Sequence, residues 1–145
     1  DESGAAAVEF ALVLIPLLWI VFGLIQYGWY FYSMQTGTSA VSSAVRKVTV
    51  GDCQSDSDLR TLIYDQLGAA TTDSKAAVGI TRTYLDGNGN SDSSPGTVGG
   101  KVTIEVTYDA TNFHFPLIPV PDGGQVTRTV SGRMEDTVAS GSPCQ

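Results

Sequence analysis

The sequence predicts an α+β fold, in which a long N-terminal α-helix packs against a small C-terminal antiparallel β-sheet head with one short helix. Residues 5–49 have the pattern of one helix, apolar all round in its first half and amphipathic in its second. A short helical stripe follows, and then segments in which apolar and polar residues alternate. With 145 residues, the chain has room for one apolar helix and one small domain.

We expect three parts: an apolar helix at residues 1–32, the amphipathic half of the same helix at residues 33–50, and a small α+β head domain at residues 51–145. The chain starts at Asp1 and not at a methionine, so we expect a processed product. The apolar segment is too long for a secretory signal peptide and lacks a basic n-region. We therefore expect it to be retained as an anchor or a packing helix.

The apolar segment from Ala5 to Tyr32 is long enough to span a membrane, which needs about 20 apolar residues. Glu9 is its only charged residue. A charge in such a segment is energetically expensive and is normally retained for a partner. The first basic residue of the chain is Arg46, so we expect the partner of Glu9 to come from another molecule.

Pro16 lies inside the apolar half of this helix. A helical proline loses one backbone hydrogen bond and clashes with the carbonyl four residues earlier, here that of Leu12. We therefore expect a kink or local opening near Pro16, with Gly23 and Gly28 as weaker points.

Beyond Tyr32 the pattern becomes amphipathic, with apolar and small residues on one face and Ser and Thr opposite. At 1.5 Å per residue the whole helix would be about 65 Å long, which exceeds the thickness of a bilayer. The second half must therefore pack on the head. The face expected to pack consists of Met34, Gly37, Ala40, Val41, Ala44, Val45 and Val48.

A short helix is expected at about Asp58–Leu67, capped by Asp56 or Ser57, with Gly68 at its C-terminal end. Its buried stripe would consist of Leu59, Leu62, Ile63 and Leu67.

Three strands are expected, of which Lys101–Asp109 shows the clearest alternation. The others are 78–84 and a Thr-rich strand at 125–135, and a loop at 86–100 joins the first two. We expect an antiparallel sheet with one face on the long helix and the other in water. The inward residues of the clearest strand would be Val102, Ile104, Val106 and Tyr108.

The segment from Thr111 to Gly124 is too apolar for a solvated loop, and it contains three prolines. We expect it either to tuck beneath its own sheet or to dock on a neighbouring molecule. Its contact residues would be Phe113, Phe115, Leu117, Ile118 and Val120.

The two cysteines are Cys53 and Cys144. In an extracytoplasmic head a disulfide is the default expectation, worth roughly 4 to 5 kcal/mol for a loop of about 90 residues in the chain-entropy model. The alternative is two unpaired thiols. Two cysteines and one distant histidine do not have the spacing of a metal site.

Composition and motifs argue against an enzyme. The only histidine, His114, lies between two phenylalanines in a Pro-rich loop, where packing or surface exposure is its expected role. No nucleophile motif and no phosphate-binding loop is found, so we expect no cofactor. A net charge of −7 without a Lys/Arg cluster argues against nucleic acid and against an anionic-lipid patch.

One weak metal candidate remains. Asp86, Asn88, Asn90 and Asp92 place oxygen ligands at alternate positions, as in a calcium loop. However, the sixth position is Ser91 where such a loop has Gly, and the twelfth is not Glu. The alternative is a flexible turn in which Asn and Gly adopt positive φ.

The stretch GAAAVEFALVLIP, from Gly4 to Pro16, resembles the N-terminus of TadE-like pilins, subunits of tight-adherence (type IVc) pili. In type IV pilin-like proteins the leader is cut after a glycine, and the acidic residue then falls fifth in the mature chain. Counting from Ala5, Glu9 is fifth, and Phe10 follows it as in the Glu-Phe pair of this family. The remainder of the chain resembles the family only in plan.

The resemblance implies a structural pilin whose identical subunits polymerise through the apolar helix into an extracellular Tad filament on a prokaryotic cell, for adhesion. It implies residence in the inner membrane before assembly, processing between Gly4 and Ala5 by a prepilin peptidase, and handling by the pilus assembly machinery. It also implies that Glu9, Phe10 and Pro16 act in assembly.

Two other classes stay open. The first is a single-span minor pilin or pseudopilin that remains in the membrane and acts in pilus assembly or secretion. The second is a membrane-anchored enzyme or calcium-dependent binding module, which an intact catalytic constellation would favour. Recovery of the protein in sheared extracellular fibres would distinguish the filament subunit from the first of these.

Overall fold

The computed structural model describes residues 2–52, 55–93 and 96–136, and it confirms the α+β fold. A long helix precedes a four-stranded antiparallel sheet and one short helix. The elements are α1 (Glu2–Thr49), α2 (Asp56–Leu67), the 3₁₀ turn η1 (Gly68–Ala70), β1 (Gly79–Leu85), β2 (Ser91–Asp92), β3 (Lys101–Asp109), the 3₁₀ turn η2 (Pro121–Gly124) and β4 (Gln125–Arg133).

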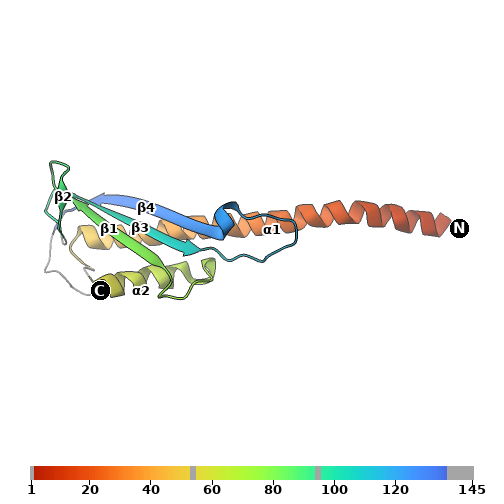
Figure 1. Ribbon diagram of the computed structural model, residues 1–145, viewed down its shortest axis with the longest axis horizontal. Helices are drawn as coiled ribbons and strands as arrows, with labels where there is room; N and C mark the ends of the chain where they lie inside the picture. Colours follow the sequence, from red (N-terminus) through yellow and green to blue (C-terminus); the bar gives the residue numbers. More distant parts are fainter. Residues whose placement is uncertain (1, 53–54, 94–95, 137–145) are drawn as a thin grey trace.

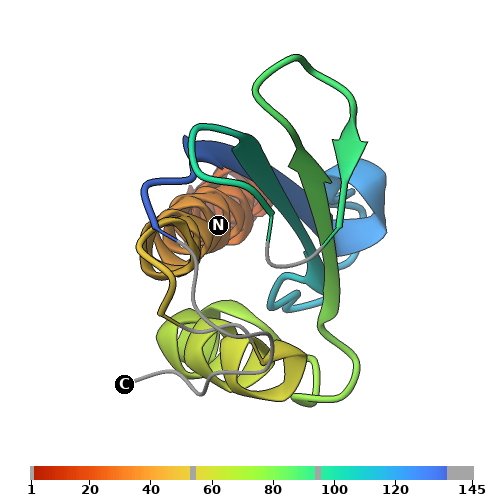
Figure 2. The same ribbon diagram turned by 90° about the vertical axis from the view of Figure 1, so that its left-hand side faces the viewer.

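Helix α1 runs the full length of the molecule, and the other elements gather around its C-terminal half (Figure 1). Seen from the head end, the sheet curves over α1 while α2 lies beside it (Figure 2). The N-terminal half of α1 extends beyond the head as a single rod (Figure 1). The C-terminal half of α1 is thus part of the head, whereas its N-terminal half projects from it.

The sheet has the strand order β2-β1-β3-β4, and all its pairs are antiparallel. Strand β3 has the predicted bounds and the predicted alternation: Val102, Ile104, Val106 and Tyr108 are buried. The short strand β2 falls inside the segment expected to be only a loop. It pairs with the end of β1, since the turn that begins at Asp86 folds the chain back on itself.

The core lies between the sheet and the second half of α1, as the amphipathic pattern predicts. Gly37 allows the closest approach, since a Cβ built there would lie 2.0 Å from the Tyr108 hydroxyl oxygen. That hydroxyl donates a hydrogen bond to the Ser33 carbonyl oxygen, 2.6 Å away. The buried residues that α1 contributes to the core are Tyr30, Ala40, Val41, Ala44, Val45 and Val48, and Met34 is partly buried beside them.

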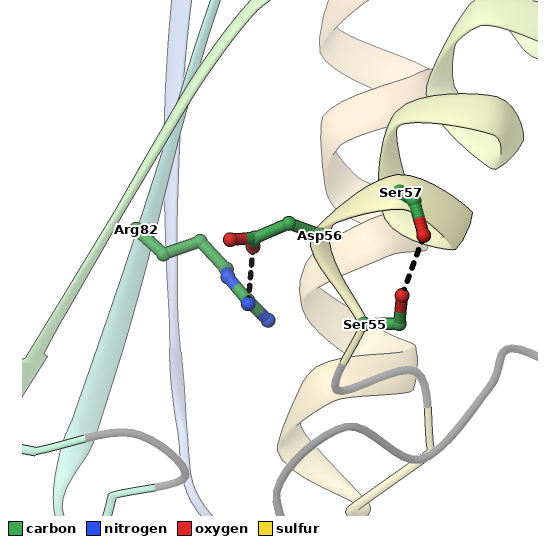
Figure 3. Close-up of polar contacts among 4 residues, drawn as sticks. All are labelled: Ser55, Asp56, Ser57 and Arg82. Carbon is green, nitrogen blue, oxygen red and sulfur yellow. Dashed lines mark hydrogen bonds and ion pairs between the residues drawn. The ribbon is translucent and has the colours of Figure 1, made fainter.

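Helix α2 begins at Asp56, two residues earlier than expected, and Ser55 is its N-cap. The expectation that Asp56 or Ser57 caps the helix is wrong, and no side-chain cap bond forms. The Asp56 carboxylate instead pairs with Arg82 on β1, and the Ser57 hydroxyl contacts that of Ser55 at 2.8 Å (Figure 3). An ion pair to the sheet thus replaces the cap. Gly68 ends the helix at φ 49°, as predicted.

The expectation of a kink at Pro16 is also wrong. Helix α1 passes through Pro16 as one continuous helix, and its ribbon shows no sharp bend along its length (Figure 1). A proline removes only one of the backbone hydrogen bonds along the helix. The bonds on either side suffice to continue it.

Replacing Gly37 with Ala is expected to destabilise the head by about 1 to 3 kcal/mol, because the new methyl group forces Tyr108 out of place. Gly28→Ala is the matched control on the same helix, since its Cβ would meet nothing within 4 Å. Urea unfolding of the detergent-solubilised protein measures both. Equal unfolding midpoints for the two variants would contradict the close contact between Gly37 and Tyr108.

Burial raises the pKa of the Tyr108 phenol above its ordinary value of 10.0. The folded state therefore prefers the neutral phenol. Its contribution to stability is fully present below pH 10 and is lost as the pH rises above it. We expect the urea midpoint to fall between about pH 9 and about pH 11, and to fall less in Tyr108→Phe. Parallel pH profiles for the two proteins would argue against this.

Candidate assembly and membrane surface

The projecting segment, residues 4–21 of α1, is exposed along almost its whole length and apolar on every side. Phe10 and Leu12 are 67% and 70% exposed. Among the described residues, α1 is the one helix long and apolar enough to cross a membrane. A continuous apolar surface of this kind is stable in lipid or against other apolar helices, but not in water. The segment therefore needs surroundings that a single chain does not provide.

Glu9 lies on this projecting segment and is exposed. Within the described part of the chain, its side chain has no hydrogen bond or ion pair. The nearest basic residue along the helix is Arg46, and the axial rise between them is about 55 Å. The structure thus offers Glu9 no partner on its own helix. Phe10 and Pro16, also singled out from the sequence, lie exposed on the same segment.

The apolar segment between β3 and β4 contacts α1 in a position that the sequence did not predict. We call residues 113–119 the clasp. It lies neither beneath the sheet nor free in solvent, but along the chain's own α1 beyond the end of the sheet (Figure 1). The expected contact is therefore made, but with the first half of α1, which is neither of the two predicted surfaces. Docking on a neighbouring molecule stays untested.

Aromatic stacking and two hydrogen bonds hold the clasp against α1. Phe115 stacks on Phe22 with ring centroids 4.9 Å apart, and Phe113 meets Trp29 edge-on at 5.6 Å. The Tyr27 hydroxyl donates to the carbonyl oxygen of residue 119 at 3.0 Å. The contacts are distributed along the clasp and fix its position relative to the helix.

Gln26 provides the other hydrogen bond, and it is only 1% exposed. Its side-chain oxygen accepts the backbone N–H of Phe113 at 3.2 Å. Sequence reasoning missed this residue. The available signal was the one amide side chain in the apolar segment from Ala5 to Tyr32, since a polar group in such a segment normally has a partner.

A shallow apolar groove of about 370 Å³ lies where the tip of the clasp meets the projecting segment. It is lined by Pro16, Trp19, Ile20, Leu117, Ile118 and Pro119. Leu117 at the tip is 79% exposed, and its φ is 65°. A leucine in the left-handed region is strained, and such strain often marks a functional position.

The residues of the weak calcium candidate make contacts within their own turn. The Asp86 carboxylate accepts the backbone N–H groups of Asn88 and Asn90, both at 2.8 Å, and these bonds, chiefly that from Asn90, lower its pKa. The Asp92 carboxylate accepts the N–H of Ser93. This arrangement is that of a turn stabilised by its own side chains. No group of His, Cys, Asp and Glu able to hold a metal occurs in the described ranges.

His114 is exposed, and its Nδ1 lies 2.9 Å from the Asn112 carbonyl oxygen within the loop. Val120 packs partly against the core. Cys53 and Cys144 lie outside the described residues, so their pairing stays a prediction.

A comparison with protein families gives a match for most of helix α1. Residues 4–46 match the family model of TadE-like proteins. The N-terminal helix of this chain is therefore similar to that of TadE-like proteins. None of the curated proteins and none of the solved structures compared with it matches. The match covers α1 up to Arg46 and stops before the head, so the family is recognised by the helix that carries the projecting segment.

TadE-like proteins are related to the Tad pilus and are typically not enzymes. TadE-like proteins are associated with the Tad pilus machinery at the cell surface, and the long apolar helix of this chain is consistent with membrane insertion. The matched segment contains Glu9, Phe10 and Pro16 together with Gln26, which holds the clasp.

Replacing Phe113 with Ser is expected to loosen the clasp, because an aromatic pair contributes about 0.5 to 1.5 kcal/mol beyond its buried area. Trp29 reports the change, since its ring packs edge-on against Phe113. In a Trp19→Phe background we expect the Trp29 emission to shift to the red. Leu117→Ser, which removes an exposed side chain, is the matched control. Identical spectra for both variants would show that the clasp does not pack against Trp29.

Proposed function

We propose that this protein is a structural pilin subunit that polymerises through the projecting segment of α1 into an extracellular Tad filament. One observation carries the proposal. The same continuous helix is buried in the head at its C-terminal half and bare and apolar at its N-terminal half. A helix that ended at the head would expose no such surface, whereas this one presents an apolar segment to lipid or to other helices.

The two environments of the projecting segment follow from its chemistry. A helix that is apolar all round is stable in lipid and equally among like helices. The same surface can therefore hold the subunit in the inner membrane before assembly and pack in a filament core afterwards. A heterologous contact that repeats without closing generates an open helical polymer. The heads at residues 51–145 would coat that core and meet the surroundings, for adhesion.

We propose that Glu9 fixes the position of one subunit relative to the next by pairing with a group of the neighbouring chain. Transfer into a filament core buries its carboxylate, and an unpaired buried charge costs several kcal/mol. The partner would be a terminal amine, a backbone N–H or a hydroxyl of a neighbouring chain. Cleavage between Gly4 and Ala5 by a prepilin peptidase would create such an amine four residues before Glu9.

Replacing Glu9 with Ala is expected to lower fibre yield at least about tenfold, because breaking a buried pair costs about 3 to 5 kcal/mol. The head should stay folded, since Glu9 lies far from the core. Fibres are sheared from cells and quantified by immunoblot, and the urea midpoint of the solubilised protein reports the head.

Glu105→Ala is the control for the loss of one negative charge, since Glu105 is exposed on β3. Its fibre yield should equal that of the wild type. A normal yield from Glu9→Ala would refute the assembly role of Glu9. Wild-type protein that remains in the membrane and never enters the sheared fraction would favour the single-span minor pilin or pseudopilin.

A further inference from the structure

The clasp descends along α1 into the part of the helix that would cross a membrane. The chain enters and leaves this region at the level of Trp29 and Tyr30: Phe113 packs on Trp29, and Asp122, three residues after the clasp, borders a small pocket with Tyr30. Its tip, residues 117–119, lies beside Pro16, Trp19 and Ile20. The clasp is fixed at this level by the stacking of Phe115 on Phe22 and by its hydrogen bonds to Gln26 and Tyr27.

The length of the span sets the depth of the tip. Residues 5–26 form a helix about 33 Å long, which matches a hydrocarbon core of about 30 Å. Aromatic residues that favour the interface follow at once, namely Tyr27, Trp29, Tyr30 and Tyr32. With this belt at the boundary on the head side, residues 16–20 and the tip beside them lie about 10 to 20 Å deeper.

The composition of the clasp suits that depth. No Asp, Glu, Lys or Arg occurs from Ala110 to Pro121. Three of the residues in this stretch are prolines, at 116, 119 and 121, which have no N–H group to satisfy. In lipid every backbone polar group must find a partner inside the protein, so missing donors are an advantage.

Several other backbone groups of the clasp have hydrogen-bond partners within the protein. The N–H of Phe113 donates to Gln26, that of His114 to the Asn112 side chain at 2.8 Å, and that of Ile118 to the Phe115 carbonyl oxygen at 3.3 Å. The carbonyl oxygen of residue 119 accepts from Tyr27. Non-helical backbone at membrane depth is tolerated where protein satisfies it in this way.

We propose that the clasp enters the head-side leaflet of the bilayer alongside α1, so that the unassembled protein is anchored by a helix and an apolar loop together. Leu117, held outward and 79% exposed, would then contact acyl chains. The insertion needs no anionic headgroup, because the clasp carries no Lys or Arg. It depends on α1 as a membrane span and not on polymerisation, so a failure to form fibres leaves it standing.

The test uses full-length protein reconstituted into phosphatidylcholine vesicles, with tryptophan quenching by lipids brominated along their acyl chains. Three proteins each carry one tryptophan. Trp29→Phe leaves the native Trp19 on α1 and reports the span. The other two carry Leu117→Trp or Val98→Trp in a Trp19→Phe, Trp29→Phe background. Val98 is the matched control, since it is 63% exposed in a loop of the head far from the clasp.

We expect quenching at position 117 to equal that of Trp19 and to exceed that at position 98 several-fold. Iodide in the aqueous phase should quench only at position 98. Iodide quenching at position 117 equal to that at 98 would overturn the proposal by placing the clasp in water. Protection at position 117 from both quenchers would also overturn it, because a second copy of the chain would then cover the groove. A Trp19 that brominated lipid does not quench would remove its premise and refute it.

Discussion

Helix α1 continues without a break from a protein core into a region where the chain itself provides almost no cover, and the rest of the structure depends on that continuity. Its C-terminal half is fastened by the packing of Val41, Ala44 and Val48 under the sheet and by the Tyr108 hydroxyl on the Ser33 carbonyl. The N-terminal half inherits its direction from this packing. A rigid rod aimed away from the head can enter a bilayer or a bundle without disturbing the domain that carries it.

The clasp changes how this rod meets its surroundings. Without it, the boundary between covered and bare helix would fall near the end of the sheet. With it, one side of α1 is contacted by the clasp from Trp29 to Phe22, and the tip of the clasp lies beside Pro16, Trp19 and Ile20. The helix therefore presents unequal sides between these levels and equal ones nearer the N-terminus. In a filament, this asymmetry would restrict the directions from which a neighbouring helix can approach the upper part of the rod.

Regular elements were predictable where a periodic pattern had one physical meaning. Strand β3 was predicted with its observed bounds because every second residue is apolar, and the stripe through Ala40 and Val41 identified the packed face of α1. The strand β2 and the start of α2 after Ser55 were missed, since β2 has only two residues and α2 begins without a side-chain cap bond. Helix α1 continues through Pro16 because the proline removes only one backbone hydrogen bond and its neighbours keep theirs.

The candidate surface was predictable in part. The apolar segment around Glu9 identified the projecting helix, and the apolar composition of residues 113–120 indicated a contact, whereas an outside partner for Glu9 stays a prediction. The surface that this loop contacts could not be deduced, because both the sheet and a neighbouring chain offered apolar area. The hydrogen bond between Gln26 and Phe113 joins residues far apart in the sequence, and only the fold brings them together.

The central claim is that the bare half of α1 is the surface through which subunits contact one another. A photoreactive amino acid placed at Leu12, which is 70% exposed, tests it most directly in fibres sheared from illuminated cells. The same substitution at Val98 on the head is the control. We predict covalent chain-to-chain products from position 12 in the sheared fraction and few from position 98. Fibres that contain the protein but yield no cross-link from position 12 would contradict the claim.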